Sequence, residues 1–261
     1  MLRTVKATRY VTPLREGGSL PAVVEADDGE TYAMKFVGAG QGAKALIAEV
    51  IAGELARALG FRIPEIVLME LDASIGRGES HQEIQDLLLK SVGLNLGMRF
   101  LPSAFAYNPL LEPPLDAQLA SEIVWFDAYI TNVDRTPRNV NMLLWEEDLW
   151  LIDHGAALYF HHNWGGDYMG QSHSPFAYIK QHVLIELASA IHAADERLRP
   201  QVTDEVLQTI VDQIPAVWLG EEEAFADAAE HRAAYVNYLA ARRDSAIRFV
   251  EEAANAHAAS V

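Results

Sequence analysis

The opening of the chain alternates between short apolar runs and glycine-rich breaks. Residues 20–26 and 31–37 are rich in apolar side chains, and Asp27-Asp28-Gly29 between them is typical of a hairpin turn. Residues 43–59 then carry apolar side chains three and four positions apart and end at Gly60, a pattern that predicts a helix. The chain is therefore predicted to begin with two paired strands followed by a helix.

The segments between residues 79 and 114 predict a boundary between two domains. Residues 79–91 fit another helix, and LNLGMRFLP at 94–102 fits a strand. Residues 107–114 contain three prolines and form the best domain boundary in the sequence. We therefore expect an N-terminal domain of residues 1–106 and a C-terminal domain of residues 107–261.

The second half predicts helices with one interruption by strands. Residues 117–131 fit a helix that Asp116 caps at its N-terminus. A hairpin is expected before the apolar strand 149–152. From residue 177 onward the sequence is helical in character and low in glycine, with breaks near Pro200 and Pro215 and a long final segment, 221–256.

Acidic and amide side chains gather at the end of the 117–131 helix and after the 149–152 strand. Asp134 is followed five residues later by Asn139, and Asp153 stands directly after the strand. Transfer of a γ-phosphoryl group needs a carboxylate that orients the acceptor hydroxyl and oxygen ligands for Mg²⁺. The spacing predicts Asp134 for the first role and Asn139 with Asp153 for the second.

Two upstream segments add to this interpretation. In TYAMKF, Lys35 shares one face of its strand with small apolar side chains, as does the lysine of the V-A-I-K strand that pairs nucleotide phosphates. Gly17, Gly18 and Ser19 precede the first strand. Backbone amides at such glycines can approach phosphates closely, so these three residues are predicted to bind the nucleotide together with Lys35.

NVDRTPRN at 132–139 followed by LIDHGAAL at 151–158 resembles the catalytic loop and metal-binding segment of the HipA-like kinases. These kinases are similar to phosphatidylinositol 3/4-kinases and, more distantly, to protein kinases. Relatives often have His after the Asp-Arg pair, where this chain has Thr136-Pro137. The resemblance implies an α+β, two-lobed protein-kinase-like fold: a small nucleotide-binding lobe with an antiparallel sheet and one helix, and a mainly helical catalytic lobe.

The resemblance also implies an activity, which is ATP- and Mg²⁺-dependent transfer of phosphate to a hydroxyl, by family analogy that of a protein Ser or Thr. It implies that Asp134, Lys35 and a helix glutamate are catalytic. The helical wheel favours Glu54, which lies on the apolar stripe, whereas the resemblance favours Glu49 ahead of the LARALG segment. Glu49 is our choice for the partner of Lys35.

Composition excludes several other classes. The 261 residues include 37 acids and 20 Lys or Arg, and the net charge of −17 opposes binding to a nucleic-acid backbone. Cysteine is absent, the start has no apolar signal-peptide core, and no run is apolar enough to span a membrane. We expect a cytoplasmic protein. The basic opening, residues 1–15, either flanks a phosphate-binding face or is an exposed strand.

Two alternative functions fit parts of the sequence. The glycines at 38–42 lie between a strand and a helix, as in a dinucleotide-binding Rossmann unit of an NAD(P) oxidoreductase. The third of these glycines falls one residue early, however, and the preceding strand fits a hairpin. A nucleotide-binding pseudokinase that serves as an interaction module is the other alternative, and Thr136 is the residue that leaves it open.

Overall fold

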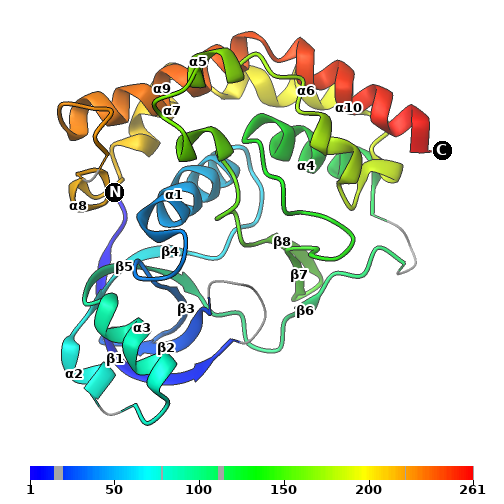
Figure 1. The fold of residues 1–261 in the computed structure, drawn as a ribbon. Coiled ribbons are helices and arrows are strands. Elements are labelled where there is room, and N and C mark those ends of the chain that lie inside the picture. Colours follow the sequence, from blue (N-terminus) through cyan, green and yellow to red (C-terminus); the bar gives the residue numbers. More distant parts are fainter. Residues whose placement is uncertain (15–19, 78, 111–114, 221, 261) are drawn as a thin grey trace.

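The fold was derived from a computed structural model, which describes residues 1–14, 20–77, 79–110, 115–220 and 222–260. A β-barrel occupies one end of the molecule, a layer of helices occupies the other, and helix α1 (Gly42–Ala58) lies between them (Figure 1). A small sheet of three strands lies beside the helical layer.

The barrel closes in the order β1-β2-β3-β5-β4. Its strands are β1 (Thr4–Pro13), β2 (Ala22–Ala26), β3 (Thr31–Lys35), β4 (Ile66–Leu71) and β5 (Gly93–Arg99). Alternate side chains such as Val24, Tyr32 and Met34 point into the barrel and are buried. The predicted hairpin is confirmed, and the described strands pair in antiparallel fashion except that β1 pairs with β4 in parallel to close the barrel.

Helices α2 (Ala73–Arg77) and α3 (Gln82–Lys90) stand between β4 and β5. With α1 they make three helices among the residues before 107 that the structure describes, so the expectation of one helix in this part is wrong. Leu88 of α3 is buried against the barrel core, and the half-buried Ile84 and Leu87 pack beside it. The apolar face of α3 therefore packs against the core of the barrel and shields it from water.

Helix α1 is apolar on nearly all sides, and its residues from Leu46 to Ala56 are buried except for Glu54, which is half-buried. These side chains belong to the same hydrophobic core as the C-terminal helices, whereas the barrel interior forms a core of its own. Gly53 lets α1 approach β4, since a Cβ there would meet the side chain of Ile66 at 2.4 Å. The division at residues 106 and 107 stays a prediction, and α1 packs across it.

The C-terminal part contains a short sheet and a set of helices. The sheet consists of β6 (Phe105–Ala106), β7 (Met142–Trp145) and β8 (Asp148–Leu151). The helices of at least four residues are α4 (Ala117–Tyr129), α5 (Tyr168–Gln171), α6 (Ile191–Leu198), α7 (Asp204–Val211), α8 (Ala216–Leu219), α9 (Ala228–Asp244) and α10 (Ile247–Ser260). Four short 3₁₀ turns lie among them: η1 (Tyr159–His162), η2 (Ala177–Gln181), η3 (Ile185–Leu187) and η4 (Arg199–Gln201).

Two helical segments of the C-terminal part can be compared directly with their predictions. Asp116 caps α4 as expected, because its carboxylate accepts hydrogen bonds from the backbone N–H groups of Gln118 and Leu119. The long helical segment predicted over 221–256 contains two described helices, α9 and α10, which follow one another along the edge of the molecule (Figure 1).

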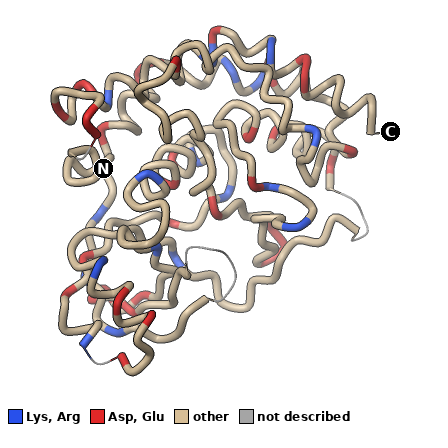
Figure 2. The backbone as a smooth tube through the Cα atoms, in the orientation of Figure 1, with Lys and Arg blue, Asp and Glu red and all other residues tan. Residues whose placement is uncertain are grey.

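The basic opening leads into strand β1, and two of its cations pair with acids. Arg3 contacts Asp28 and Glu65, and Arg9 pairs with Glu25. Figure 2 shows Lys and Arg distributed along the chain, often next to acidic residues. In the part of the chain that the structure describes, no helix has the length and apolar character needed to cross a bilayer.

The packing of α1 can be tested by shortening one side chain. Leu55 is 0% exposed, so Leu55→Ala leaves a cavity and should lower the free energy of unfolding by about 2–5 kcal/mol. Leu110 is 86% exposed, and Leu110→Ala should change it by about 0.5 kcal/mol or less. Chemical denaturation of both variants measures the difference, and equal effects would contradict the placement of α1 in the core.

Candidate active site

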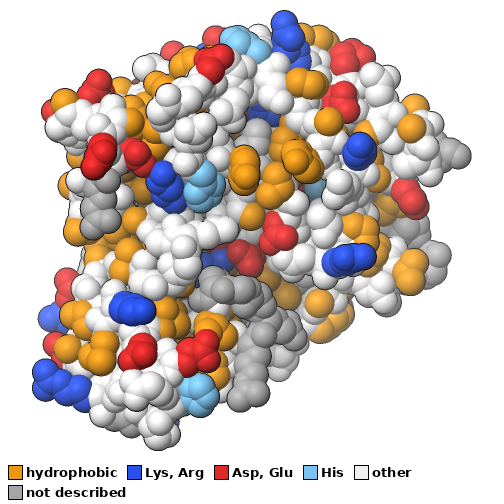
Figure 3. All heavy atoms as spheres, viewed as in Figure 1, with side chains coloured by type: hydrophobic (Ala, Val, Ile, Leu, Met, Phe, Trp, Pro, Cys, Tyr) orange, Lys and Arg blue, Asp and Glu red, His pale blue; other side chains and the backbone are white. Residues whose placement is uncertain are grey.

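A cavity of about 350 Å³ lies where the barrel, α1 and the C-terminal part meet. It is lined by Lys35, Asp134, Asn139 and Asp153, together with residues 39–42. Figure 3 shows acidic side chains near the centre of one face of the molecule. The structure therefore gathers four of the predicted site residues, which span 118 positions of sequence, around one space.

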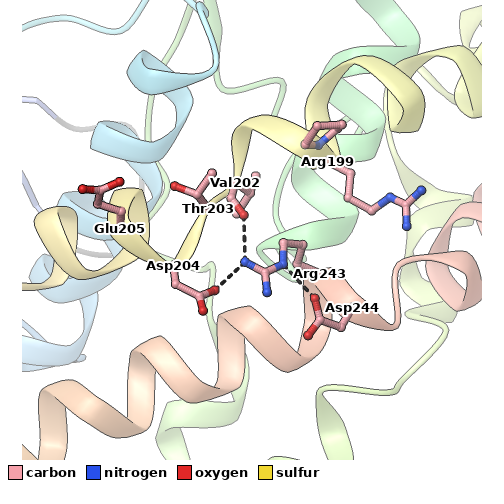
Figure 4. A pocket seen from close by; sticks show the side chains of 8 residues that line it. Arg199, Val202, Thr203, Asp204, Glu205, Arg243 and Asp244 are labelled. Carbon is pink, nitrogen blue, oxygen red and sulfur yellow. Dashed lines mark hydrogen bonds and ion pairs between the residues drawn. The ribbon is translucent and has the colours of Figure 1, made fainter.

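A larger and shallower hollow, of about 630 Å³, lies between α7 and the end of α9 (Figure 4). Three of its charged side chains already pair with one another, since Arg243 donates to Asp204 at 2.6 Å and to Asp244 at 2.8 Å. None of the predicted site residues lines it. Volume therefore does not identify the site here, whereas the convergence of unlike polar groups does.

Lys35 is the centre of the ionic contacts in the 350 Å³ cavity. Its Nζ donates to Oε1 of Glu49 and, at 2.6 Å, to Oδ1 of Asp153. Burial alone would lower the pKa of this amine, but the charges of the two carboxylates outweigh burial and raise the pKa. Lys35 is therefore a fixed cation. Glu54, the other candidate on α1, faces Arg57 at 3.3 Å instead.

Local structure explains how these groups meet. Lys35 is the last residue of β3, Glu49 lies in the second turn of α1 with 0% exposure, and Asp153 follows β8. Asp153 has a φ of 55°, a left-handed conformation that aspartate tolerates better than most residues. A Cβ at position 155 would lie 3.3 Å from Oε1 of Glu49, so glycine leaves room for the buried carboxylate.

Asp134 and Asn139 lie in the loop of residues 132–139, which follows α4. Nδ2 of Asn139 donates to Oδ2 of Asp134 at 2.6 Å, and Asn141 reaches the same oxygen at 3.4 Å. Burial and the nearby negative charge of Asp153 raise the pKa of Asp134. A carboxylate with a raised pKa accepts a proton more readily, which suits a group that orients and deprotonates a hydroxyl.

The residues after Asp134 form a tight turn. Thr136 and Asn139 exchange backbone hydrogen bonds of 3.0 Å in both directions, and Pro137 and Arg138 form the exposed tip. Proline suits such a position because its φ is already restricted to turn values. The Thr136-Pro137 pair thus shapes the loop without displacing Asp134 or Asn139 from the cavity.

The predicted phosphate-binding residues cannot be placed in the same way. Gly17, Gly18 and Ser19 lie outside the described residues. Residues 39–42, which sequence reasoning assigned only to the rival Rossmann unit, line the cavity instead. They connect β3 to α1, but β3 is antiparallel to both of its neighbours, so this segment is not a Rossmann unit.

Comparison with protein families adds to this geometry. A family model described as HipA-like kinase matches residues 8–247. The chain belongs to the HipA-like kinase family. The match covers both the barrel and the helical part, and so includes every site residue named above. Family and fold together support a kinase, that is, a phosphotransferase activity.

Solved structures show the same fold at low sequence identity. The Helicobacter pylori proinflammatory kinase CtkA has a TM-score of 0.57 at 12% identity, with 97% of this chain and 98% of that chain covered. The Golgi casein kinase with Mn/ADP bound has a TM-score of 0.51 at 13% identity, with 100% and 75% covered. No curated protein sequence matches this HipA-like kinase. These likenesses show a kinase-like fold.

Asp127 is a supporting residue that sequence reasoning missed. It is 0% exposed in α4, and its carboxylate accepts from Nε of Arg135 at 2.5 Å and from Nδ2 of Asn132 at 2.9 Å. Nε2 of His182 lies 2.8 Å from the same group. Burial would raise the pKa of Asp127, but Arg135 and His182 outweigh it and hold that pKa well below its usual range.

This buried carboxylate ties the 132–139 loop to α4 and to the segment that contains His182. A signal for it existed in the sequence, because an aspartate inside the apolar run WFDAY requires a buried partner. The partner could not be identified, since His182 is 55 residues away.

Removing this charge should destabilise the kinase strongly. Asp127→Asn leaves the Arg135 cation buried without its counter-ion, so the free energy of unfolding should fall by about 3–5 kcal/mol. Asp148→Asn is the matched control, because Asp148 forms an exposed pair with Arg62 at 2.9 Å and should cost about 1 kcal/mol or less. Urea denaturation compares the two, and a small loss in Asp127→Asn would refute the structural role.

Proposed function

We infer that this HipA-like kinase transfers the γ-phosphate of ATP to a hydroxyl group with the help of Mg²⁺. The observation that carries the proposal is the position of Lys35, which contacts Glu49 and Asp153 at the wall of a cavity that also contains Asp134. A fixed cation for phosphate, an acidic oxygen ligand and a proton-accepting carboxylate are the groups that phosphoryl transfer requires.

The residues present suit a magnesium ion. Asp153 offers a carboxylate, and Asn139 offers its amide oxygen because its nitrogen is engaged by Asp134. No group of three or more His, Cys, Asp or Glu side chains in the described ranges could hold a metal alone. Mg²⁺ is usually held by one or two carboxylates with water and substrate phosphates, and it would supply neutralisation of phosphate charge here.

The chain's own residues then have distinct tasks. Lys35 neutralises phosphate oxygens, and Glu49 holds its ammonium in place. Asp134 accepts a hydrogen bond from the acceptor hydroxyl and takes its proton as the oxygen forms a bond to the γ-phosphorus. The bond between that phosphorus and the bridging oxygen of ADP breaks in the same step, and ADP leaves.

Further support comes from the Golgi casein kinase, whose structure was solved with Mn/ADP bound. A nucleotide and a divalent cation therefore fit this fold. The acceptor we propose is a protein Ser or Thr, on the likeness to protein kinases. The presence of Lys35, Asp134, Asn139 and Asp153 in one cavity favours an active enzyme over a pseudokinase that only binds nucleotide.

The metal role of Asp153 can be tested by binding alone. Wild-type protein should bind ATP more tightly in Mg²⁺ than in EDTA, and Asp153→Ala should lose this difference, with affinity in Mg²⁺ falling roughly ten-fold or more. Calorimetric titration of both proteins in both buffers measures it. Asp148→Asn serves as control, and a Mg²⁺ dependence that persists in Asp153→Ala would remove the assignment.

The role of Asp134 concerns chemistry rather than affinity. Asp134→Asn keeps the shape of the side chain but removes the proton acceptor, so kcat should fall roughly 10²–10⁴-fold. The dissociation constant for ATP·Mg²⁺ should change little, because other residues hold the phosphates. Transfer of labelled phosphate, measured beside the ATP titration, separates the two quantities. A wild-type rate in Asp134→Asn would make Asp134 a structural residue.

A further inference from the structure

A second cavity, here named the side cavity, adjoins the 132–139 loop away from Lys35 and Asp153. It has a volume of about 650 Å³ and is lined by residues 136–138, by residues 180–183 with Ile185 and Glu186, and by Ser260. The loop therefore contributes to two cavities, with Asp134 and Asn139 in one and the turn between them in the other. A molecule in the side cavity lies next to the proposed acceptor position.

The two walls of the side cavity are held together by buried contacts. The backbone N–H of Val183 donates to the carbonyl oxygen of Arg135 at 3.1 Å. Arg135 and His182 both contact Asp127, which is inaccessible to water. Lys180, at the end of η2, is thus kept in a fixed relation to the tip of the 132–139 loop. The side cavity is consequently a preformed feature rather than a gap between independent segments.

The described lining of the side cavity includes two cations that pair with no described carboxylate. Most Lys and Arg side chains of the described part form ion pairs with carboxylates, in keeping with an excess of acids. Arg138 and Lys180 are both exposed and form no ion pair with any described residue. Glu186 is the one acid among the described lining residues, and the remaining side chains are neutral or apolar. Burial lowers the pKa of His182 and outweighs its contact with Asp127, which acts to raise that pKa.

We propose that the side cavity binds an acidic segment of the acceptor protein, in which Asp or Glu side chains flank the hydroxyl that receives phosphate. This role rests on the proposed transfer at Asp134. The net charge of −17 opposes acidic partners at long range. Salt screens that repulsion beyond about 8 Å at physiological ionic strength. The contacts made by Arg138 and Lys180 therefore decide which peptide sequences the side cavity prefers.

Geometry limits where the acidic residues stand. Arg138 stands four positions after Asp134, which sets the distance between their Cα atoms at about 14 Å or less. An extended peptide advances about 3.3 Å per residue. The preferred Asp or Glu should therefore lie within about four positions of the phosphorylated Ser or Thr. Acidic residues farther away should have little effect on the rate.

The test uses synthetic peptides with one central Ser and a pair of Asp residues at varied distance from it, compared with peptides that carry Lys at the same positions. Wild-type kinase should phosphorylate the near-Asp peptides with kcat/KM about ten-fold above the Lys peptides, mainly through KM. The double variant Arg138→Glu with Lys180→Glu should reverse this preference. High salt should reduce it in the wild type.

Matched controls separate charge from damage to the fold. Arg248→Glu changes an exposed cation on α10 that lies outside the side cavity, and it should keep the wild-type preference. The single variants Arg138→Glu and Lys180→Glu should each give an intermediate preference. A melting temperature within a few degrees of wild type shows that each variant is folded.

The outcomes distinguish the proposed docking role of the side cavity from the proposed phosphotransfer at Asp134. Equal kcat/KM for Asp and Lys peptides, or an acidic preference that survives in the double variant, would overturn the docking role while leaving phosphotransfer intact. Absence of transfer to every peptide, in a wild-type protein that binds ATP·Mg²⁺, would overturn the proposed phosphotransfer and the docking role with it. A preference that is acidic in the wild type and reversed in the double variant supports both.

Discussion

The burial of the Glu49 carboxylate is the constraint on which the site depends. A carboxylate with 0% exposure is costly to place in a protein unless a cation compensates it, and Lys35 is that cation. Because Lys35 also contacts Asp153, one ammonium group joins β3, α1 and the segment after β8. The barrel, the central helix and the C-terminal part therefore share a single ionic contact, and any shift of one of them would leave a buried charge without its partner.

The packing of α1 makes that contact durable. Its apolar side chains belong to the core of the C-terminal helices, and Lys44 in its first turn pairs with Glu222 at 2.8 Å. In addition, the indole of Trp218 on α8 donates to the backbone of β5 at 3.1 Å, which joins the barrel to the same helices. The helix that carries Glu49 is thus held from both sides, and the contact between Lys35 and Glu49 is built into the hydrophobic core.

A second buried carboxylate, that of Asp127, holds the 132–139 loop in place, as the carboxylate of Glu49 holds the ammonium group of Lys35. It accepts hydrogen bonds from two residues of the loop, while His182 from a distant segment contacts the same group. These polar contacts hold the loop in place in addition to the packing of Val133 against the core. Each part of the site that carries a proposed chemical role is in this way supported by a group that water does not reach.

The sequence by itself determined those features that depend on nearby residues. The spacing of Asp134 and Asn139 places both in one turn, the strand before Asp153 delivers that residue to the site, and the periodicity of 43–59 determines a helix. The tertiary structure alone decided which glutamate meets Lys35, that β1 closes the barrel in parallel with β4, and that Asp127 pairs with a histidine 55 residues away. The physical reason is range: periodicity and turn chemistry act over a few residues, whereas the direction in which a helix presents a side chain depends on the packing of the whole core against it.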